Sequence, residues 1–424
     1  MNLSTKTDLW DTLAAAKKPI LLYGMGNGAD KILRVCEAYG IEISDFFASD
    51  GFVRGHSFHG KVVLSYSEAK QKYGSFIVLL SFASSLPDVL DTIHRVAEEN
   101  ELYAPDVPVF GDNLFNMKFF REHENELDEV YSLLADDESR HTLRSVIEYK
   151  LSGDISFLDA CEADEESVTR QLVRPETVRQ YVDLGAYNGD TIKKLLPLAP
   201  HLSQVLALEP DCRNFRKLSE YAEGLAGKIN IKPLPLAAWD RRETLLMDAS
   251  GNRNANLSAG GKKTVSVEAD ALDNVIDDLR PDYIKYDVEG SEREALEGSR
   301  NIIRTCTPRL LISLYHRSED LFTLPALIRD IAPHYKLYLR KLRYIPAWDL
   351  NLYAVPDGSE GEKYHVQIRA PYAHQGRQCL WEILGRGNGG ILYLPRLLGR
   401  RCHRSFLSRQ HRPRPRSCVA RFRD

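Results

Sequence analysis

The stretch YVDLGAYNGDT, from Tyr181 to Thr191, decides the fold of this chain. It begins as a buried strand and then places Asp183, Gly185 and Gly189 where an ordinary strand would stay apolar. Glycine lets the backbone approach a ligand closely, and the helix expected to follow begins with free N–H groups. The pattern is therefore typical of a strand–loop–helix ligand site in an open parallel sheet.

Strands and helices continue to alternate after this stretch, which is how parallel sheets are built. The last two strands are joined by too little chain for a crossover helix, so they should pair antiparallel. We expect residues 176–356 to form a doubly wound, Rossmann-like domain that ends in this hairpin. Its further strands are predicted at residues 205–210, 229–238, 283–289, 309–316, 335–342 and 350–356.

The first part of the chain shows a second series of the same kind. Residues 1–112 are predicted to form a separate Rossmann-like domain, followed by a helical bridge at 113–175 in which Gly153 ends a helix. The glycines of LYGMGNGAD (22–30) depart from the G-x-G-x-x-G spacing, although Asp50 stands where a ribose-binding acid could lie. The strands of this domain are predicted at residues 19–26, 41–50, 61–65, 75–81 and 107–110, with helices at 29–40 and 86–101.

Composition indicates a soluble, two-domain protein. The chain has 424 residues, 43% of them hydrophobic, and no apolar run reaches membrane-spanning length. Its seven cysteines form no C-x-x-C pair and no zinc-type cluster with histidine. We therefore predict a cytoplasmic protein that does not bind membranes.

The last segment of the chain has a different composition. Residues 366–424 hold thirteen arginines, no lysine and two acids, a net +11, so a total of -4 leaves about -15 for the rest. Residues 357–424 are expected to form a basic, disordered tail, because they cannot bury enough apolar surface to fold. A shifted reading frame of GC-rich DNA would give the same composition.

The residues at the strand ends point to one cofactor. Asp183 would repel a pyrophosphate but attract an ammonium group, and S-adenosylmethionine has an amino-acid end and no phosphate. Glu209 ends the next strand, where an acid can accept both hydroxyls of a ribose. Asp287 should face the same cleft as Asp183, since their strands are neighbours in the common 3-2-1-4-5 order. Further cofactor contacts are predicted for Gly185, Tyr187 and Gly189 in the loop, and for Ala238, Trp239 and Asp240 around the adenine.

Together these residues resemble the FkbM-type S-adenosylmethionine-dependent methyltransferases. The likeness rests on VDLGAYNGDT, ALEPD, AAWD, PDYIKYDVEGSEREALEG and PRLLISLYHRSEDL, and it covers about residues 128–356. It implies a class I methyltransferase fold and O-methylation of a hydroxyl, often on a sugar, glycan or secondary metabolite. It assigns cofactor roles to Asp183, Gly185, Gly189, Glu209 and Asp287.

A sugar hydroxyl is a poor nucleophile and benefits from a positioned base. Asp287 is the first candidate by position, and His316, at the end of the fifth strand, is the second. Glu289 and Glu292 add carboxylates, so a divalent metal is an alternative way to activate the hydroxyl. The segment ASGNRNANLSAGGKK (249–263) is expected to lie over the pocket.

Three other functions stay open at this point. The basic tail suggests a nucleic-acid methyltransferase, but DVEG stands where an Asn/Asp-Pro-Pro-aromatic turn is typical, and Pro-Cys is absent. A nicotinamide- or nucleotide-sugar-binding oxidoreductase could use the first domain, although no Tyr-x-x-x-Lys stands out there. A binding scaffold is the third. We expect a small-molecule or glycan acceptor rather than nucleic acid, and the oligomeric state is left open.

Overall fold

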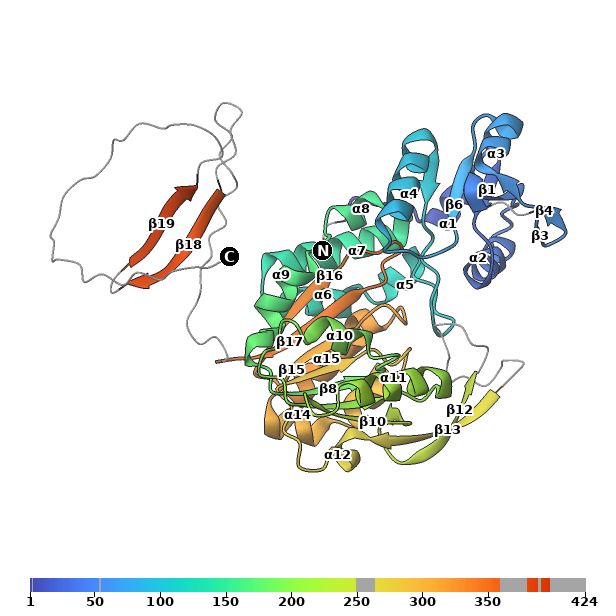
Figure 1. Ribbon diagram of the computed structural model, residues 1–424. Coiled ribbons are helices and arrows are strands. Elements are labelled where there is room, and N and C mark those ends of the chain that lie inside the picture. The colour runs from blue at the N-terminus through green and yellow to red at the C-terminus, as the bar shows by residue number, and fades with distance from the viewer. Residues whose placement is uncertain (2, 53–54, 249–263, 359–379, 388–389, 397–424) are drawn as a thin grey trace, which may run out of the picture. The chain divides into compact units, whose positions relative to one another are not determined.

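The computed structural model describes residues 1, 3–52, 55–248, 264–358, 380–387 and 390–396 (Figure 1). The chain divides into two units, Met1–Glu360 and Gly361–Asp424. In the second unit, strands β18 (Leu380–Gly387) and β19 (Gly390–Arg396) pair antiparallel. Most of the expected tail lies outside the described residues, as does the segment 249–263 that we expected over the pocket.

The N-terminal part of the first unit contains a five-stranded parallel sheet in the order β5-β2-β1-β6-β7. Its three central strands, β2, β1 and β6, are fully buried and almost entirely apolar, as a sheet covered on both faces requires. A short β3–β4 ribbon stands beside it. The strands are β1 (Ile20–Tyr23), β2 (Asp45–Ala48), β3 (Ser57–Phe58), β4 (Lys61–Val62), β5 (Leu64–Ser65), β6 (Ile77–Leu80) and β7 (Glu101–Tyr103), and the helices are α1 (Leu9–Ala14), α2 (Asn27–Ala38), α3 (Tyr66–Tyr73) and α4 (Pro87–Glu99), with a 3₁₀ turn at Asp50–Phe52.

Two predicted strands of this sheet differ from the structure. The predicted strand 61–65 is divided between β4, which pairs with β3 in the ribbon, and β5, which pairs with β2. Residues 107–110 are not a strand, and the edge strand is instead β7, which begins directly after α4. The prolines at 105 and 108 explain the difference, because proline has no N–H to donate to a strand ladder.

Helices connect this sheet to the next one, as the apolar spacing predicts. The longest, α7, begins at the N-cap Asp136, whose side chain accepts from the N–H of Ser139, and ends at Gly153 in the left-handed conformation. The other helices of the segment are shorter and amphipathic or irregular. In order, the helices of the segment are α5 (Met117–Glu122), α6 (Glu124–Leu133), α7 (Asp137–Ser152), α8 (Ser156–Asp159) and α9 (Glu165–Val168), which runs into a π-helical turn (Thr169–Val173) and a 3₁₀ turn (Pro175–Thr177).

The larger sheet has seven strands in the order β10-β9-β8-β14-β15-β17-β16. Its first five strands are parallel, and β17 pairs antiparallel with both β15 and β16. This is the predicted doubly wound sheet with a terminal hairpin, the order of a class I methyltransferase fold. The strands are β8 (Gln180–Leu184), β9 (Gln204–Leu208), β10 (Asn230–Leu234), β14 (Tyr283–Tyr286), β15 (Arg309–Ser313), β16 (Tyr335–Lys341) and β17 (Leu350–Pro356).

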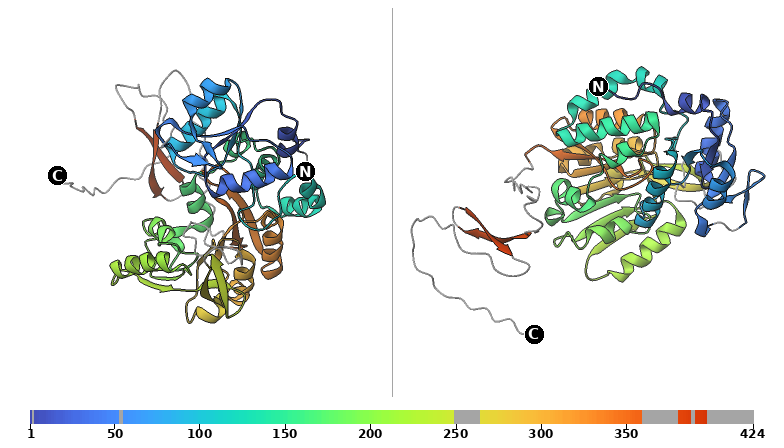
Figure 2. Two further views of the ribbon diagram at one scale, coloured as in Figure 1. Left: turned by 90° about the vertical axis from the view of Figure 1, so that its right-hand side faces the viewer. Right: turned by 90° about the horizontal axis from the view of Figure 1, so that it is seen from above.

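Helices cover both faces of this sheet (Figures 1 and 2). One face packs on α6, α7, α13, α14 and α15, and the other packs on the π-helical turn, α10 and α11. Among the described helices, none combines the length and apolar character needed to cross a bilayer. The helices not yet bounded are α10 (Asp190–Leu195), α11 (Cys212–Gly224), α12 (Leu272–Val275), α13 (Glu292–Glu297), α14 (Arg300–Cys306) and α15 (Asp320–Ile331).

The segment predicted as one strand at 229–238 is split between two sheets. Its first half is β10, and its end is β11 (Ala237–Trp239), which pairs parallel with β13 (Thr264–Ala271). Strand β12 (Glu243–Asp248) completes this small third sheet. Because β11 pairs with β13 and does not continue in the main sheet, its last residues do not lie where a continuous strand of the main sheet would place them.

Candidate active site

The glycine loop after β8 is shaped by two close approaches. Gly185 has a φ of +77°, and a Cβ there would lie 1.8 Å from the carbonyl oxygen of Asp287. Gly189 has a φ of +81°, and a Cβ there would meet the Tyr221 ring at 2.8 Å. Gly185 therefore excludes any side chain, and at Gly189 the positive φ and the Tyr221 ring disfavour one, so the loop can lie directly against the end of β14.

Glu209 closes this loop from the end of β9. Its Oε2 accepts from the backbone N–H of Tyr187 at 2.8 Å, and its Oε1 accepts from the N–H of Asp211 at 2.9 Å. The side chain is buried, and burial raises its pKa to about 7 although these two hydrogen bonds act in the opposite direction. Each oxygen keeps a lone pair for a further donor.

Strand register gathers three charged side chains on one face of the sheet. Lys285 pairs with Asp183 across the β14–β8 ladder, and Asp287 follows two residues later on the same face. The Lys285 Nζ lies 3.4 Å from Asp183 Oδ1 and 3.5 Å from Asp287 Oδ2, and it donates to the carbonyl oxygen of Gly185 at 3.2 Å. Lys285 therefore ties the glycine loop to both carboxylates.

Burial and neighbouring charges together shift the pKa values of Lys285 and Asp183. Burial alone would lower the pKa of Lys285, but Asp183 and Asp287 more than offset it and raise that pKa. Asp183 is completely buried, and burial raises its pKa to about 6 even with Lys285 beside it. The cation that Asp183 faces in the protein is thus a lysine.

Asp287 is held by a set of donors. Its Oδ1 accepts from the Ser313 hydroxyl and from the Tyr315 hydroxyl, both at 3.0 Å. Burial would raise its pKa, but Lys285, His316 and these hydroxyls lower it overall. Asp287 is therefore an ionised, firmly oriented carboxylate.

His316 lies behind Asp287 and is completely buried. Its Nδ1 is 3.0 Å from Oε1 of Glu292, and its Nε2 is 3.4 Å from Oε2 of Glu289. Burial alone would lower the pKa of His316, but Glu292 and Glu289 raise it well above the usual value. Its backbone oxygen accepts from the N–H of Phe110 at 2.9 Å, which holds the main chain at this position.

The cluster of carboxylates around His316 could in principle bind a metal ion. Among the described residues, Asp287, Glu292 and His316 bring three ligand-type atoms within 4.8 Å of one another. Oδ1 of Asp287, however, already accepts two hydrogen bonds, and Oε1 of Glu292 accepts from the N–H of Val288 at 2.9 Å. Since these oxygens already have donors, the cluster gives no independent support for a metal, and binding of a divalent metal stays a prediction from the sequence.

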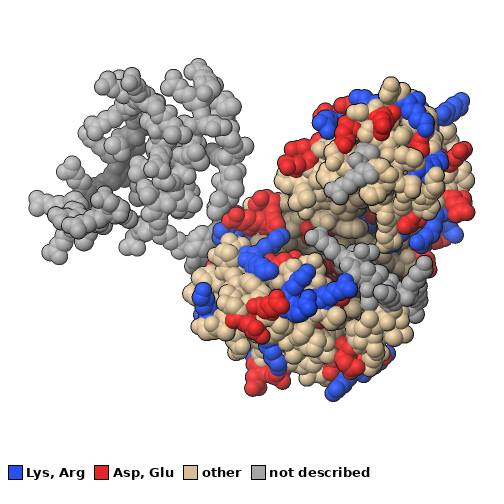
Figure 3. Space-filling view, turned by 45° about the vertical axis from the view of Figure 1, so that its right-hand side comes forward, with Lys and Arg blue, Asp and Glu red and all other residues tan. Residues whose placement is uncertain are grey.

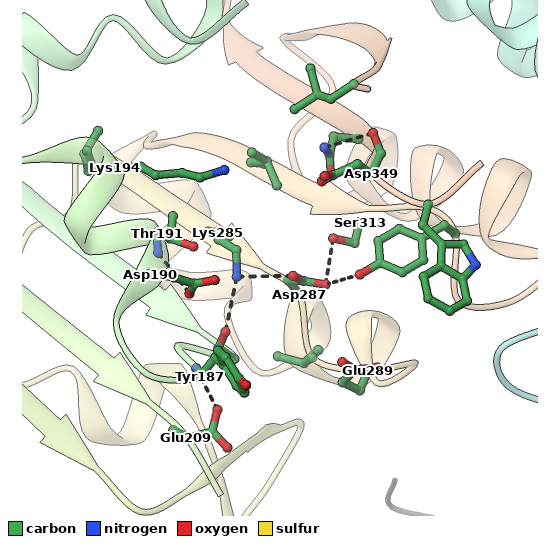
Figure 4. Close-up of a pocket in the computed structure, with 18 of the residues that line it drawn as sticks. Tyr187, Asp190, Thr191, Lys194, Glu209, Lys285, Asp287, Glu289, Ser313 and Asp349 are labelled. Carbon is green, nitrogen blue, oxygen red and sulfur yellow. Dashed lines mark hydrogen bonds and ion pairs between the residues drawn. The ribbon is translucent and has the colours of Figure 1, made fainter. Parts of the chain in front are cut away.

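A cavity of about 820 Å³ joins these elements on one face of the larger sheet (Figure 4). This volume is within the range of about 300–1,000 Å³ that small-molecule sites occupy. Figure 4 shows Glu209 and Tyr187 on one side of Asp287, and Asp349 and Glu289 on the other. The cavity thus has two ends with Asp287 between them.

The comparisons with known proteins decide what kind of domain holds this cavity. Residues 183–346 match the family described as the methyltransferase FkbM domain. Residues 183–346 are an FkbM methyltransferase domain. A comparison with curated protein sequences gives no significant match.

Solved structures agree on the fold. The FkbM methyltransferase from Methylobacillus flagellatus KT is 21% identical, with a TM-score of 0.59 over 80% of this chain and 90% of that one. A precorrin-6y C5,15-methyltransferase from Geobacter metallireducens GS-15 is 12% identical, with a TM-score of 0.28 over 46% and 90%. Aeropyrum pernix fibrillarin with bound S-adenosyl-L-methionine is 15% identical, with a TM-score of 0.27 over 42% and 66%. The last two scores are too low to carry an argument, and the first supports the class I methyltransferase fold.

The FkbM domain places half of the predicted site residues at the cavity. Those that line it are Gly185, Tyr187, Glu209, Ala238 and Asp287. The others stand apart from the lining: Asp183 lies beneath the loop, Gly189 caps α10, and His316 is behind Asp287. Trp239 packs with the small β11-β13-β12 sheet, and Asp240 pairs with Arg241 at 3.1 Å, because β11 leaves the main sheet.

Several residues of the cavity were missed by sequence reasoning. They are Lys285, Tyr315, Tyr344, Trp348 and Asp349. For Lys285 a signal existed, because a lysine two residues before Asp287 must share its face of the strand. The last three come from the loop between β16 and β17, and the sequence has no pattern that places this loop at the cavity.

The glycine-rich loop of the N-terminal sheet is packed differently. A Cβ at Gly28 would lie 2.2 Å from the carbonyl oxygen of Ser81, and one at Gly24 would lie 2.7 Å from the Phe82 ring. Asp50 accepts from the backbone N–H and hydroxyl of Ser67 at 3.0 and 2.7 Å. Packing within the sheet therefore accounts for Gly24 and Gly28, and Asp50 has an internal partner, whereas a Cβ at Gly26 would meet nothing within 4 Å.

Proposed function

We propose that the protein is an S-adenosylmethionine-dependent O-methyltransferase that methylates a hydroxyl of a sugar, glycan or secondary metabolite. The observation that carries this proposal is the two-ended cavity, which is lined mostly by residues of the FkbM domain. Gly185, Tyr187 and Glu209 form one end, which suits the amino-acid and ribose parts of the cofactor. The opposite end is then left for the acceptor.

The cofactor end suits S-adenosylmethionine in its donor set. The buried Glu209 can accept hydrogen bonds from ribose hydroxyls, because each of its oxygens keeps one lone pair. The glycine loop leaves space beside α10, and Ala238 gives an apolar wall. When bound, S-adenosylmethionine would supply the methyl group on its sulfonium.

The reaction is an in-line displacement. The acceptor oxygen forms a bond to the methyl carbon while the carbon–sulfur bond breaks, and S-adenosylhomocysteine leaves. Alignment of the two reactants can contribute roughly 7–11 kcal/mol to such a step. The hydroxyl proton must pass to a base.

Two carboxylates can be compared for that role. Asp287, the residue predicted from sequence, has a lowered pKa and three donors, so it is a weak base that suits orientation and electrostatic support. Glu289 also lines the cavity, with a φ of +54°, and burial raises its pKa. We therefore assign proton acceptance to Glu289, with His316 holding its carboxylate.

Binding and transfer can be tested separately. Calorimetry with S-adenosylhomocysteine should give micromolar binding that Glu209→Ala weakens by at least about tenfold, the loss of roughly 1.4 kcal/mol. Transfer of a labelled methyl group to a panel of hydroxylated acceptors tests the reaction. A well-folded protein that binds neither S-adenosylmethionine nor S-adenosylhomocysteine would refute the proposal.

A further inference from the structure

The acceptor end of the cavity has an aromatic wall. Tyr315 follows β15, and Tyr344 and Trp348 belong to the loop between β16 and β17. The Trp348 ring stacks near Tyr315 with centroids 6.3 Å apart and an interplanar angle of 25°, and it lies 5.8 Å from the Tyr344 ring. Three half-buried rings therefore offer a broad face to a ligand.

The N-terminal sheet holds this wall in place. Ser84, which follows β6, exchanges two backbone hydrogen bonds with Ile345, at 2.9 and 3.0 Å. Ile345 itself is buried in the core that contains β1 and β6. The aromatic loop is thus preformed before an acceptor arrives, which reduces the entropy lost on binding.

The charge of the cavity is strongly one-sided. Nine of its lining residues are acidic and two are lysines, and both lysines are already in ion pairs. Lys194 lies 2.7 Å from Glu165, and Lys285 is held between Asp183 and Asp287. The acids are Asp164, Glu165, Glu166, Asp190, Glu209, Asp211, Asp287, Glu289 and Asp349.

The excess of acidic side chains in the cavity favours some classes of acceptor over others. A phosphate or carboxylate would have to enter a cavity with excess negative charge and no uncommitted lysine among its lining residues, and like charges brought together in a buried site oppose binding strongly. Ionised carboxylates are pure hydrogen-bond acceptors, so they match hydroxyl or ammonium donors. Aromatic rings favour ligands with an apolar face, and they also attract cations.

We propose that the wall formed by Tyr315, Tyr344 and Trp348 receives a sugar ring that carries no phosphate or other anionic group. Asp349 and Glu289 accept hydrogen bonds from the ring's hydroxyls, or from an ammonium group where the sugar is an amino sugar. The assignment rests on the proposed function and narrows it, since it excludes nucleotide-linked and phosphorylated sugars as acceptors. Several carboxylates favour a polyhydroxylated ring over a phenol, which has few donors.

The test uses the full chain saturated with S-adenosylhomocysteine at pH 8, on the alkaline side of neutrality, because burial raises the pKa of both Glu289 and Asp349. Binding of methyl glucoside, glucosamine, glucose 6-phosphate and catechol is measured by saturation-transfer NMR and calorimetry. We expect the first two to bind at least about tenfold more tightly than the phosphate. Stronger binding of the phosphate or of catechol, or binding of no sugar by the loaded protein, would overturn the assignment. Failure to bind S-adenosylhomocysteine would instead count against the proposed function.

Two variants test the role of the aromatic wall and the role of the cavity's negative charge separately. Trp348→Leu should abolish sugar binding and leave S-adenosylhomocysteine binding unchanged, which also shows that the variant is folded. Asp349→Asn should reduce the preference for neutral over phosphorylated sugar by about threefold or more. Asp277→Asn is the matched control, because Asp277 also has a positive φ, 52° against 62° at Asp349, but lies outside the cavity lining. An unchanged preference in Asp349→Asn, or an equal change in the control, would contradict the role of Asp349.

Discussion

Glu209 should make cofactor binding depend on pH. Burial raises the pKa of this carboxyl to about 7, while the ribose hydroxyls of S-adenosylmethionine donate most strongly to its ionised form, in which both oxygens are acceptors only. Ligand binding therefore favours the ionised state, and affinity should rise as the pH increases through 7. The hydrogen bonds from Tyr187 and Asp211 keep the carboxyl in place in both states.

The size of this effect follows from the pKa. With a pKa of about 7, the ionised fraction of Glu209 is about 9% at pH 6 and about 91% at pH 8. The dissociation constant of S-adenosylhomocysteine should therefore fall about tenfold between these pH values, equal to roughly 1.4 kcal/mol. Above pH 8 it should stay constant.

Calorimetric titrations at half-unit steps from pH 5.5 to 8.5 would measure this curve. Glu209→Gln keeps the shape of the side chain and cannot ionise, so its weaker affinity should be flat across the range. A flat curve for the unmodified protein would refute the reasoning. So would a Glu209→Gln variant with the same slope, since the titrating group would then lie elsewhere, with Asp183 and its pKa of about 6 the first alternative.

Three further outcomes are expected. Lys285→Met should destabilise the protein by about 3–5 kcal/mol in urea unfolding, because it leaves Asp183 and Asp287 as a buried carboxylate pair without their cation; a loss below 1 kcal/mol would contradict this. Gly185→Ala should abolish S-adenosylhomocysteine binding measured by calorimetry, since its Cβ would lie 1.8 Å from a carbonyl oxygen; tight binding by the variant would show that the loop can move. Deletion of residues 361–424 should leave cofactor affinity and the melting temperature unchanged, because these residues form a separate unit; a large loss of either would make the tail a working part of the enzyme.

The face of the first unit shown in Figure 3 has acidic and basic side chains interspersed. A protein that binds nucleic acid usually concentrates lysine and arginine on one face or stripe. On the face seen, this pattern gives no support to nucleic acid as the acceptor. The acidic lining of the cavity points in the same direction.

Local signals were enough to predict most of the larger sheet. Apolar strands of four to seven residues, the glycine loop and the short connection before residue 350 define its strands and its hairpin. The same signals failed at 107–110, where a proline interrupts the apolar residues, and at 229–238, where one apolar run serves two sheets. Both errors arise because an apolar run records burial but not the ladder in which a strand pairs.

Site residues could be predicted only where a glycine or an acidic residue interrupts the apolar pattern at the end of a strand. Gly185, Glu209 and Asp287 are of this kind, since each breaks an apolar pattern at a position that the fold brings to one edge. Lys285 could have been found from the period of two along β14, which places it beside Asp287. Trp348 and Asp349 could not, because the position of their loop depends on a contact with Ser84, far away in the sequence.

The contact between Ser84 and Ile345 suggests why an FkbM domain is joined to a second α/β sheet. The N-terminal sheet contributes Ser84 to the loop with the aromatic wall, and Phe110, beyond its last strand, holds the backbone of His316. Phe110 also packs against Gly290, where a Cβ would meet its ring at 2.7 Å, so the loop with Glu289 is supported from the same side. Gly24 and Gly28 of its own loop pack against Phe82 and Ser81, so these two glycines have a structural role within the N-terminal sheet. Its contacts reach the acceptor end and the proposed base, whereas Glu209 and the glycine loop are built within the FkbM domain. Differences between relatives in this sheet should therefore change the acceptor more than the cofactor.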